Sequence, residues 1–409
     1  MSKVLQRVRK FWLNEMEAIT CIMFVLIAIG TINICSASLI TAYTDFESPY
    51  YFLNRHLFSI FVGTVAFFIV SQCFNYRRLR NKYFLLAMFL IIVVMLIAVL
   101  FFGVEVNGSR RWLSLSVIQF QPSELAKFVT IILAALHLGP CLDKDLTITL
   151  NPRKNWTFLL CFFLAALVEL EEDMGTAIMV IGIPVAMYVI AGLPRSWKIF
   201  LATLSIVGLS GFVALQPYRL ARVNTWIDPW SDIQGDGYQV IQSMLAIGSG
   251  KFSGMGLGQG FSKYSYLPEA HTDFAFAVYA QETGFIGVMI IFLLIVALAF
   301  YCVKIAMRTR DGFGKMLVIG FTLLITCQAA INLSMIVGLL PVVGVPLPFI
   351  SYGGTSLLLN MISVAIIINV GRHIPLTNAP NTQTIPADTA VHKTYTTKSG
   401  KVTHLRRVK

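Results

Sequence analysis

Long apolar runs separated by short polar segments dominate this chain. A helix that crosses a bilayer needs about twenty mainly apolar residues, and ten runs approach that length. Because this pattern extends over most of the sequence, it predicts an all-α polytopic membrane protein with about ten transmembrane helices. The predicted spans are 16–39, 56–74, 82–103, 124–139, 157–170, 174–193, 197–215, 274–303, 315–339 and 355–371.

Two of these runs, 124–139 and 157–170, are short and carry or adjoin charged residues. We expect both helices to face the protein interior rather than lipid. The first run is too long for a cleavable signal sequence and is therefore predicted to remain as a span.

Most connections between the runs are short, but residues 216–273 separate the seventh span from the eighth. Long ordered loops usually carry function. This one contains Arg219, Arg222 and a glycine-dense stretch at 248–260. A phosphate-binding loop would need a preceding strand and a following Lys-Ser or Lys-Thr pair, and both are missing from the sequence. The glycines favour a tight surface loop with turns of positive φ.

The segment 341–354, between the last two spans, contains no charge but several prolines and glycines. Broken backbone at membrane depth is tolerated only where it is buried in protein or lines a cavity. The pattern therefore predicts a re-entrant segment, with a structural hinge as the alternative.

Composition supports the membrane assignment. The chain has 409 residues, of which 56% are hydrophobic and 13% charged, and its mean hydropathy is +0.74. These values exclude an ordinary soluble enzyme of this size. Residues 375–409 are polar and basic, and we expect a disordered tail that touches anionic inner-leaflet lipid. The predicted membrane domain is 1–374. The seven cysteines are scattered and indicate neither a disulfide framework nor a zinc site.

The distribution of Lys and Arg predicts the orientation. With the N-terminus inside, 17 of these residues lie on inner segments and 7 on outer segments. Both termini are then cytoplasmic, and 216–273 is a large extracellular loop. The net charge of +12 reflects this topology and the tail, so nucleic acid binding is not predicted.

Ionisable residues stand at the point where the outer loop runs into the eighth span. Glu269, His271 and Asp273 precede an apolar run. Ionisable groups at the edge of a membrane-embedded chain are costly and mark functional sites. Asp273 and Thr272 are also good helix caps, so capping is the alternative for Asp273, and a structural role is the alternative for His271.

Further charges gather at the start of the fourth span. Arg110 and Arg111 precede Glu124 and Lys127. The last two are three residues apart on one helix face and could simply neutralise each other. In the other interpretation, the lysine and the arginines form a cationic cavity for an anionic head group, because Arg suits bidentate phosphate contact.

A short outer turn carries four carboxylates, at Glu169, Glu171, Glu172 and Asp173. They are expected to be solvated by default. Binding of a divalent cation or a basic partner is the alternative.

Several long motifs in order resemble the SEDS family, the shape, elongation, division and sporulation proteins. The resemblance covers about residues 15–373. It rests on NGSRRWLSL with QPSELAK (107–127), GDGYQ with QSMLAIGSGKFSGMGLG (235–258), LPEAHTDFAFAV (267–278) and PVVGVPLPFISYGGTS (341–356).

By this resemblance, Asp273 matches the essential acidic residue of the family. Basic positions that line the central cavity of the family are matched by Arg110, Arg111, Lys127, Arg219 and Arg222. Further signature positions are matched by Glu124 and the segment 341–354. Lys263, in the outer loop, and Ser351, in the broken segment, complete our candidates for substrate binding. The candidate substrate-binding residues are Arg110, Arg111, Lys127, Arg219, Arg222, Glu124, Lys263 and Ser351.

The chain departs from the family pattern at two places. The usual Gln-Pro-Asp-Leu-Gly-Thr is replaced by residues 171–176, and the usual Glu-Glu pair is Gln281 and Glu282. The first departure weakens any role assigned to that turn, and the second makes Gln281 a poor acid or base. EAHTDF and PFISYGG lean toward the division branch of the family, FtsW, rather than the elongation branch, RodA.

The resemblance implies a peptidoglycan glycosyltransferase that polymerises lipid II at the outer face of the bacterial cytoplasmic membrane. Its implied partners are a class B penicillin-binding protein and other division or elongation proteins. Asp273 would act as the base and the cations would stabilise the leaving pyrophosphate. No cofactor is fixed by the sequence, and a divalent cation, Mg²⁺ or Mn²⁺, is left open. The rival hypotheses are a lipid II flippase and a non-catalytic division scaffold.

Overall fold

The computed structural model describes residues 14–374 apart from 107–108, 116–117, 152, 215–216, 234 and 265–266. The predicted tail at 375–409 lies outside the described residues. Each of the ten predicted apolar runs is helical. The corresponding helices are α2 (Glu15–Phe46), α3 (Tyr51–Gln72), α4 (Lys82–Phe102), α5 (Pro122–Asp143), α6 (Trp156–Leu170), α7 (Met174–Ile190), α8 (Arg195–Ala214), α11 (Ala275–Arg308), α12 (Gly312–Ile336) and α13 (Gly354–Arg372).

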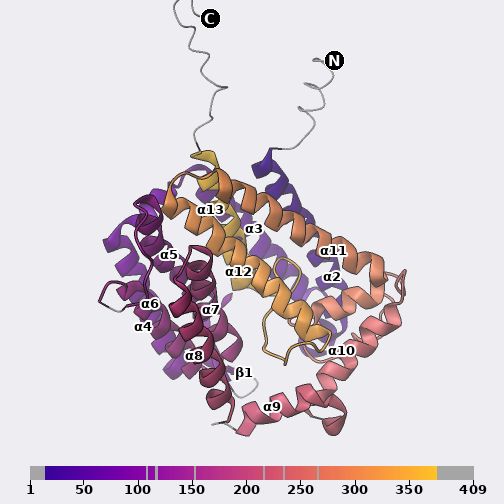
Figure 1. Cartoon of the computed structure of the whole chain (residues 1–409). Helices are drawn as coiled ribbons and strands as arrows, with labels where there is room; N and C mark the ends of the chain where they lie inside the picture. Colours follow the sequence, from indigo (N-terminus) through magenta and orange to yellow (C-terminus); the bar gives the residue numbers. More distant parts are fainter. Residues whose placement is uncertain are drawn as a thin grey trace, which may run out of the picture. The chain divides into compact units, whose positions relative to one another are not determined.

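The helices form a bundle built on pairs that are distant in sequence (Figure 1). Helix α13 packs on α3, α12 on α5, and α11 on both α2 and α12. Seven described helices are long and apolar enough to cross a membrane, namely α2, α3, α4, α5, α11, α12 and α13, whereas α6 and α7 are shorter apolar helices. The chain is thus an all-α multi-pass membrane protein, and the count of ten spans stays a prediction.

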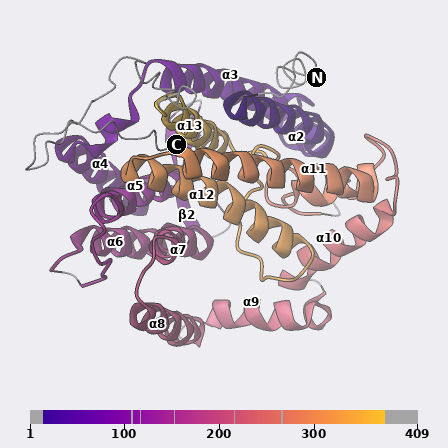
Figure 2. The same cartoon turned by 45° about the horizontal axis from the view of Figure 1, so that its top comes forward.

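The expected interior position is confirmed for α5 and wrong for α6. Helix α5 contacts α4, α6, α7 and α12 and is mostly buried. Helix α6 buries only one face, because Phe162 and Phe163 on its other face are 60% and 45% exposed. Its apolar residues surround the whole helix, which suits a helix with one side toward lipid. Helices α8 and α9 lie at the edge of the bundle (Figure 2).

A small antiparallel sheet, which the apolar pattern did not predict, precedes α5. It consists of β1 (Val104–Val106), β2 (Ser109–Leu115) and β3 (Ile118–Phe120) in the order β1-β2-β3. Glu105 pairs with Arg110, and Leu113 pairs with Phe120. The sheet holds Arg111 close to the start of α5.

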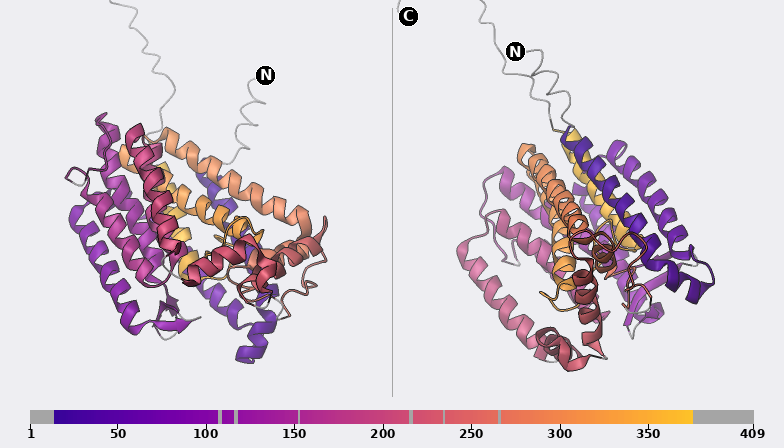
Figure 3. Two further views of the ribbon diagram at one scale, coloured as in Figure 1. Left: turned by 60° about the horizontal axis from the view of Figure 1, so that its bottom comes forward. Right: turned by 90° about the vertical axis from the view of Figure 1, so that its right-hand side faces the viewer.

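The loop at 216–273, called the outer loop after its predicted side, is largely ordered. It contains α9 (Pro217–Ile227), a short 3₁₀ helix η2 (Pro229–Asp232) and α10 (Asp236–Gly250). Trp226 Nε1 donates to the carbonyl of Gly338 at 3.0 Å, and Ser243 Oγ donates to that of Ile336 at 2.8 Å. The loop therefore rests on the end of α12, as Figure 3 also shows. A second 3₁₀ helix, η1 (Tyr76–Arg80), connects α3 to α4.

The glycine-dense stretch only partly follows its prediction. Its first glycines lie in α10, whereas Gly254, Gly256 and Gly258 adopt φ values of +79°, +104° and +78°. This part docks onto α11, which is broken at Gly284. The amides of Met255 and Gly256 donate to the carbonyls of Gln281 and Glu282. The loop thereby satisfies backbone groups that the break leaves without helical partners.

The apolar segment 341–353 between α12 and α13 has no regular structure; Val345, Leu347, Phe349 and Ile350 are buried, and Val342 and Val343 are partly buried. Gly30 of α2 packs directly on it, because a Cβ there would lie 2.3 Å from the carbonyl oxygen of Phe349. Burial within protein, which the pattern of prolines and glycines predicted, is confirmed.

Candidate active site

Asp273 lies one residue before the N-cap of α11. The N-cap is Phe274, and no side chain in the described part of the chain caps this helix, so the capping alternative for Asp273 is wrong. Its main chain is held by Asn332 of α12, whose Nδ2 donates to the carbonyl of Asp273 at 2.9 Å and to that of Val345 at 2.7 Å. One buried amide therefore ties the carboxylate-bearing turn to the broken segment.

Arg111 and Asp273 meet at Gly344. A Cβ on Gly344 would lie 3.5 Å from Asp273 Oδ2 and 4.0 Å from Arg111 Nη1. Gly344 has a φ of +66°, a conformation that suits glycine. The absence of a side chain at this residue leaves the space between the carboxylate and the guanidinium open.

Burial sets the acidity of Asp273. Its surroundings raise the pKa of this carboxyl to about 7, first by desolvation and then by the charges of Glu269 and Asp173, while Arg111 opposes the shift. Desolvation and like charges both disfavour the ionised form. A carboxyl with this pKa can accept a proton near neutral pH.

The carboxylate turn between α6 and α7 forms the other wall of the site. Arg111 Nη2 donates to the carbonyl of Glu172 at 2.5 Å. Asp173 accepts from Gln121 Nε2 at 3.0 Å and from the amide of Thr176 at 3.2 Å, so it caps α7. The expectation that this turn is solvated is wrong for Asp173 and Glu171, which are each 2% exposed.

Glu171 is an unusual member of this wall. Both of its carboxyl oxygens are buried and have no hydrogen-bond partner among the residues that the structure describes. Burial and the charge of Asp173 raise its pKa to about 9, against the effect of Arg111. Glu171 is therefore protonated at neutral pH and adds no negative charge beside Asp273.

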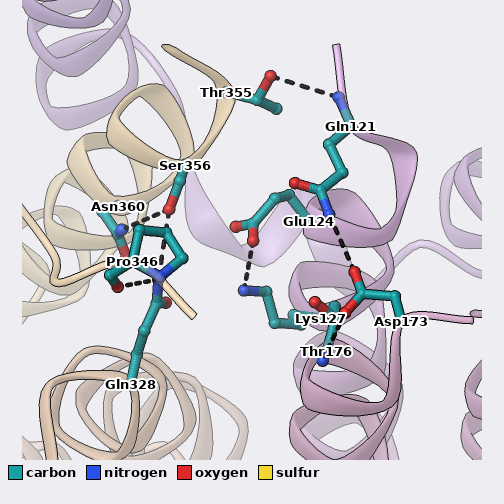
Figure 4. Close-up of polar contacts among 10 residues, drawn as sticks. All are labelled: Gln121, Glu124, Lys127, Asp173, Thr176, Gln328, Pro346, Thr355, Ser356 and Asn360. Carbon is teal, nitrogen blue, oxygen red and sulfur yellow. Dashed lines mark hydrogen bonds and ion pairs between the residues drawn. The ribbon is translucent and has the colours of Figure 1, made fainter. Parts of the chain in front are cut away.

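Glu124 and Lys127 form a buried ion pair one turn inside α5, with Nζ and Oε1 2.6 Å apart. The predicted mutual neutralisation is confirmed. The pair lies between the polar group around Gln121 and Asp173 and a second group on α12 and α13 (Figure 4). The second group consists of Gln328, Ser356 and Asn360, with Gln328 also donating to the carbonyl of Pro346.

The remaining candidates lie elsewhere in the described structure. Arg110 is on the opposite face of β2, exposed and 3.5 Å from Glu105. Ser351 Oγ accepts from the amide of Leu347 at 3.0 Å. Arg219 is in α9, and its side chain lies outside the described residues. Arg222 is exposed and lines a small pocket with Thr225, Trp226, Gln239, Val240 and Val342.

Lys263 has a full set of protein partners. Its Nζ donates to Glu282 Oε1 and Ser36 Oγ at 3.0 Å and to the carbonyl of Gly258 at 2.6 Å. An ammonium group has three donors, so none remains for a substrate in this arrangement. The lysine holds the outer loop to α2 and α11.

The sequence did not single out Gln121 or Asn332 as site residues, and it weighed Glu171 only as one of four solvated or cation-binding carboxylates. Asn332 carried a usable signal, because a polar side chain within an apolar span is rarely without a function. Among the described residues, no three His, Cys, Asp or Glu side chains are grouped so that they could hold a metal ion.

Comparison with known proteins gives a consistent result. A sequence profile of the FtsW, RodA and SpoVE group, described as "Cell cycle protein", matches residues 16–375. Stage V sporulation protein E of Bacillus subtilis is 37% identical over 357 residues, covering 86% of this chain and 95% of its own length. A probable peptidoglycan glycosyltransferase FtsW of Hydrogenovibrio crunogenus is 37% identical over 355 residues, covering 85% of this chain and 88% of its own.

Solved structures show the same fold. One chain, from the study "Structural coordination of polymerization and crosslinking by a peptidoglycan synthase complex", has a TM-score of 0.68 and 28% identity, covering 88% of this chain and 98% of its own. The rod shape determining protein RodA of Thermus thermophilus has a TM-score of 0.63 and 25% identity, covering 87% of this chain and 96% of its own.

Proposed function

Because this chain belongs to the FtsW/RodA/SpoVE family, the SEDS proteins, we propose that it is a peptidoglycan glycosyltransferase that polymerises lipid II. The relatives named FtsW are described as probable peptidoglycan glycosyltransferases. One observation carries the proposal for this chain: a partly buried carboxyl with a pKa near 7 faces an arginine across an open glycine at one end of an apolar bundle.

Asp273 is the general base of the proposed reaction. The hydroxyl of the acceptor sugar loses its proton to the carboxylate as its oxygen attacks the anomeric carbon of the donor. A positioned base of this kind contributes about 10²- to 10⁴-fold in rate. Its pKa of about 7 suits this role, because catalysis by a base is most effective when its pKa lies near the working pH.

Arg111 stabilises the departing lipid pyrophosphate. Its Nη1 lies 4.0 Å from the place of a Cβ on Gly344, at the open space beside Asp273, so this end of the guanidinium can meet an anionic oxygen. Displacement in line inverts the donor sugar from an α to a β linkage. Lys127 lies deeper, is 1% exposed and is neutralised by Glu124, so no direct contact with the leaving group is assigned to it.

The place of the site suits a lipid-linked substrate. The segments that carry Arg111, Asp173, Asp273 and Gly344 follow α4, α6, α8 and α12. These are every second span and run in the same direction, so the four segments share one end of the bundle. The lipid tail stays in the bilayer while the head group reaches this end. We place it at the outer face of the bacterial cytoplasmic membrane, with both termini inside, because of the bias of Lys and Arg.

A class B penicillin-binding protein is the proposed partner, and septal wall synthesis is the proposed process. One structural neighbour is a chain from work on a peptidoglycan synthase complex that coordinates polymerization and crosslinking. Relatives named FtsW and a sporulation protein both match at 37% identity. No step is assigned to Mg²⁺ or Mn²⁺, since the described acidic residues do not form a group that fits a metal ion.

The test is Asp273→Asn, purified with the partner and assayed for polymerisation of labelled lipid II. The rate is expected to fall by about 10²- to 10⁴-fold. The melting temperature at pH 8 is expected to stay at or above that of the wild type, because the buried group no longer carries a charge. Glu105→Gln removes an exposed carboxylate and serves as the control. Polymer formation by Asp273→Asn at the wild-type rate would exclude this residue as the base.

The same preparations separate the rival functions. A flippase would move lipid II across sealed vesicles and form no polymer in detergent. A non-catalytic scaffold would support cell division when Asp273 is replaced by Asn at normal protein levels.

A further inference from the structure

A row of aromatic rings runs from the turn between α2 and α3 to the loop that carries Asp273. We call it the aromatic row. Phe46 and Tyr51 are stacked with their centroids 3.7 Å apart and their planes 7° apart. Phe52 meets both rings edge-on and contacts His271 at 4.4 Å and Tyr352 at 5.3 Å. The row consists of Phe46, Tyr51, Phe52, His271 and Tyr352.

The exposed end of the row is a ring that is stacked on its neighbour. The guanidinium of Arg55 lies 4.7 Å from the centroid of Tyr51. Because Phe46 covers one face of Tyr51, Arg55 must cover the other. Phe46 thus ends a stack of a cation and two rings, and it is still 45% exposed. A large apolar ring fixed in this way offers a flat face to a ligand at little cost in side-chain entropy.

The other end of the row joins the candidate active site. The amide of Tyr352 donates to the carbonyl of His271 at 3.0 Å, and His271 stands two residues before Asp273. The row is therefore continuous with the turn that holds the proposed base, and it belongs to the same end of the bundle.

We propose that Phe46 and the stack behind it form a binding platform for an N-acetylated sugar ring of the glycan strand. This inference rests on the proposed function and adds a second contact for its carbohydrate. A pyranose has an apolar C–H face, which packs on an aromatic ring, and a rim of hydroxyls. Asp45 and Glu47 flank Phe46 and are exposed, so their carboxylates can accept hydrogen bonds from that rim.

A lipid head-group layer is the competing occupant, since aromatic residues are common at membrane interfaces. Two observations favour the sugar. The carboxylates of Asp45 and Glu47 would repel anionic lipid, and the exposed ring of Phe46 is stacked on Tyr51 rather than standing alone at the surface. The glycan strand that leaves Asp273 supplies an occupant of matching chemistry along the same row.

Binding of chitotetraose, a soluble N-acetylglucosamine oligomer, tests the platform directly. The protein carries Asp273→Asn, so that binding is measured without catalysis, and it is held in nanodiscs of phosphatidylcholine, which has no net charge. Binding is measured by saturation-transfer NMR. Phe46→Ala is expected to weaken binding about two- to tenfold, the range for one aromatic contact, and Phe46→Trp to preserve it. The control is Phe61→Ala, because Phe61 is 67% exposed on α3 outside the row.

Length analysis of glycan strands gives the second measurement, in protein with Asp273 intact. Phe46→Ala should shorten the strands while Phe61→Ala leaves them unchanged. Absence of chitotetraose binding to the parent protein, or equal binding by the Phe46→Ala variant, overturns the platform even if polymerisation proceeds. Sugar binding that is unchanged in Phe46→Ala would assign the ring to the lipid interface instead. Failure of the parent protein to polymerise lipid II would instead count against the proposed function.

Discussion

Two neighbouring arginines show what the residue scale decides. In β2, successive side chains point to opposite faces, so Arg111 reaches the carbonyl of Glu172 while Arg110 pairs with Glu105 at the surface. The sequence placed both in one cationic cavity, because no strand was predicted there.

Asp273 could be found from sequence, since a carboxylate beside an apolar run is costly. The burial of Glu171 could not, because four neighbouring carboxylates are normally solvated.

The pKa of Asp273 predicts the pH dependence of polymerisation. The base must be ionised, and its pKa is raised to about 7, so the rate should rise about tenfold per pH unit below 7 and level off above it. Glu269 contributes to the upward shift. Glu269→Gln is therefore expected to move the rising limb to lower pH, as measured by initial rates between pH 5 and 9. A limb that moves upward would show that Glu269 does not act on Asp273 by charge.

Arg111→Met should move the rising limb of the pH dependence of polymerisation to higher pH. The guanidinium lowers the pKa of Asp273, so its removal leaves the carboxyl harder to ionise and shifts the limb to higher pH. The plateau rate should also fall, because the leaving pyrophosphate loses a donor. Arg110→Met is the matched control, since its partner Glu105 is at the surface, and the limb should keep its position. A drop in rate without a pH shift would restrict Arg111 to substrate binding.

At the scale of elements, long apolar runs were enough to predict α2 to α8 and α11 to α13, but not α9 and α10 of the long loop. Two features escaped because their signals are weak. Strands of three residues, such as β1 and β3, leave almost no periodic pattern. The break of α11 at Gly284 depends on amides and carbonyls of the glycine-dense stretch, and no local pattern predicts which distant backbone will satisfy a broken helix.

The start of α7 is expected to tolerate no side chain where it packs on the broken segment. A Cβ on Gly175 would lie 2.2 Å from the carbonyl oxygen of Val343, next to the glycine between Asp273 and Arg111. Gly175→Ala should destabilise the protein by about 1–3 kcal/mol, as overpacking typically does, and reduce polymerisation. Gly182→Ala in the same helix meets no atom within 4 Å, so both its melting temperature and its activity should match the wild type. Equal behaviour of the two variants would contradict the close packing.

At the scale of the whole molecule, the alternation of spans brings distant segments to one end. Residues near 111, 172, 273 and 344 meet because each follows a span or a short sheet at that end. The sequence predicts this convergence, since the parity of the spans fixes which turns share a side. It does not predict the depth of each group, which depends on packing between α5, α12 and α13.

The orientation of the bundle gives the last prediction. Cys73 is exposed where α3 ends, close to the arginines of η1, and Lys251 is exposed in the outer loop. Two variants should react oppositely with a membrane-impermeant maleimide on intact spheroplasts. The first keeps Cys73 as its only cysteine, and the second has all native cysteines replaced and carries Lys251→Cys. The second should be labelled and the first only after permeabilisation, because positive residues stay inside. Labelling of Cys73 on intact spheroplasts would invert the topology and place the proposed site in the cytoplasm, where exported sugar acceptors are absent.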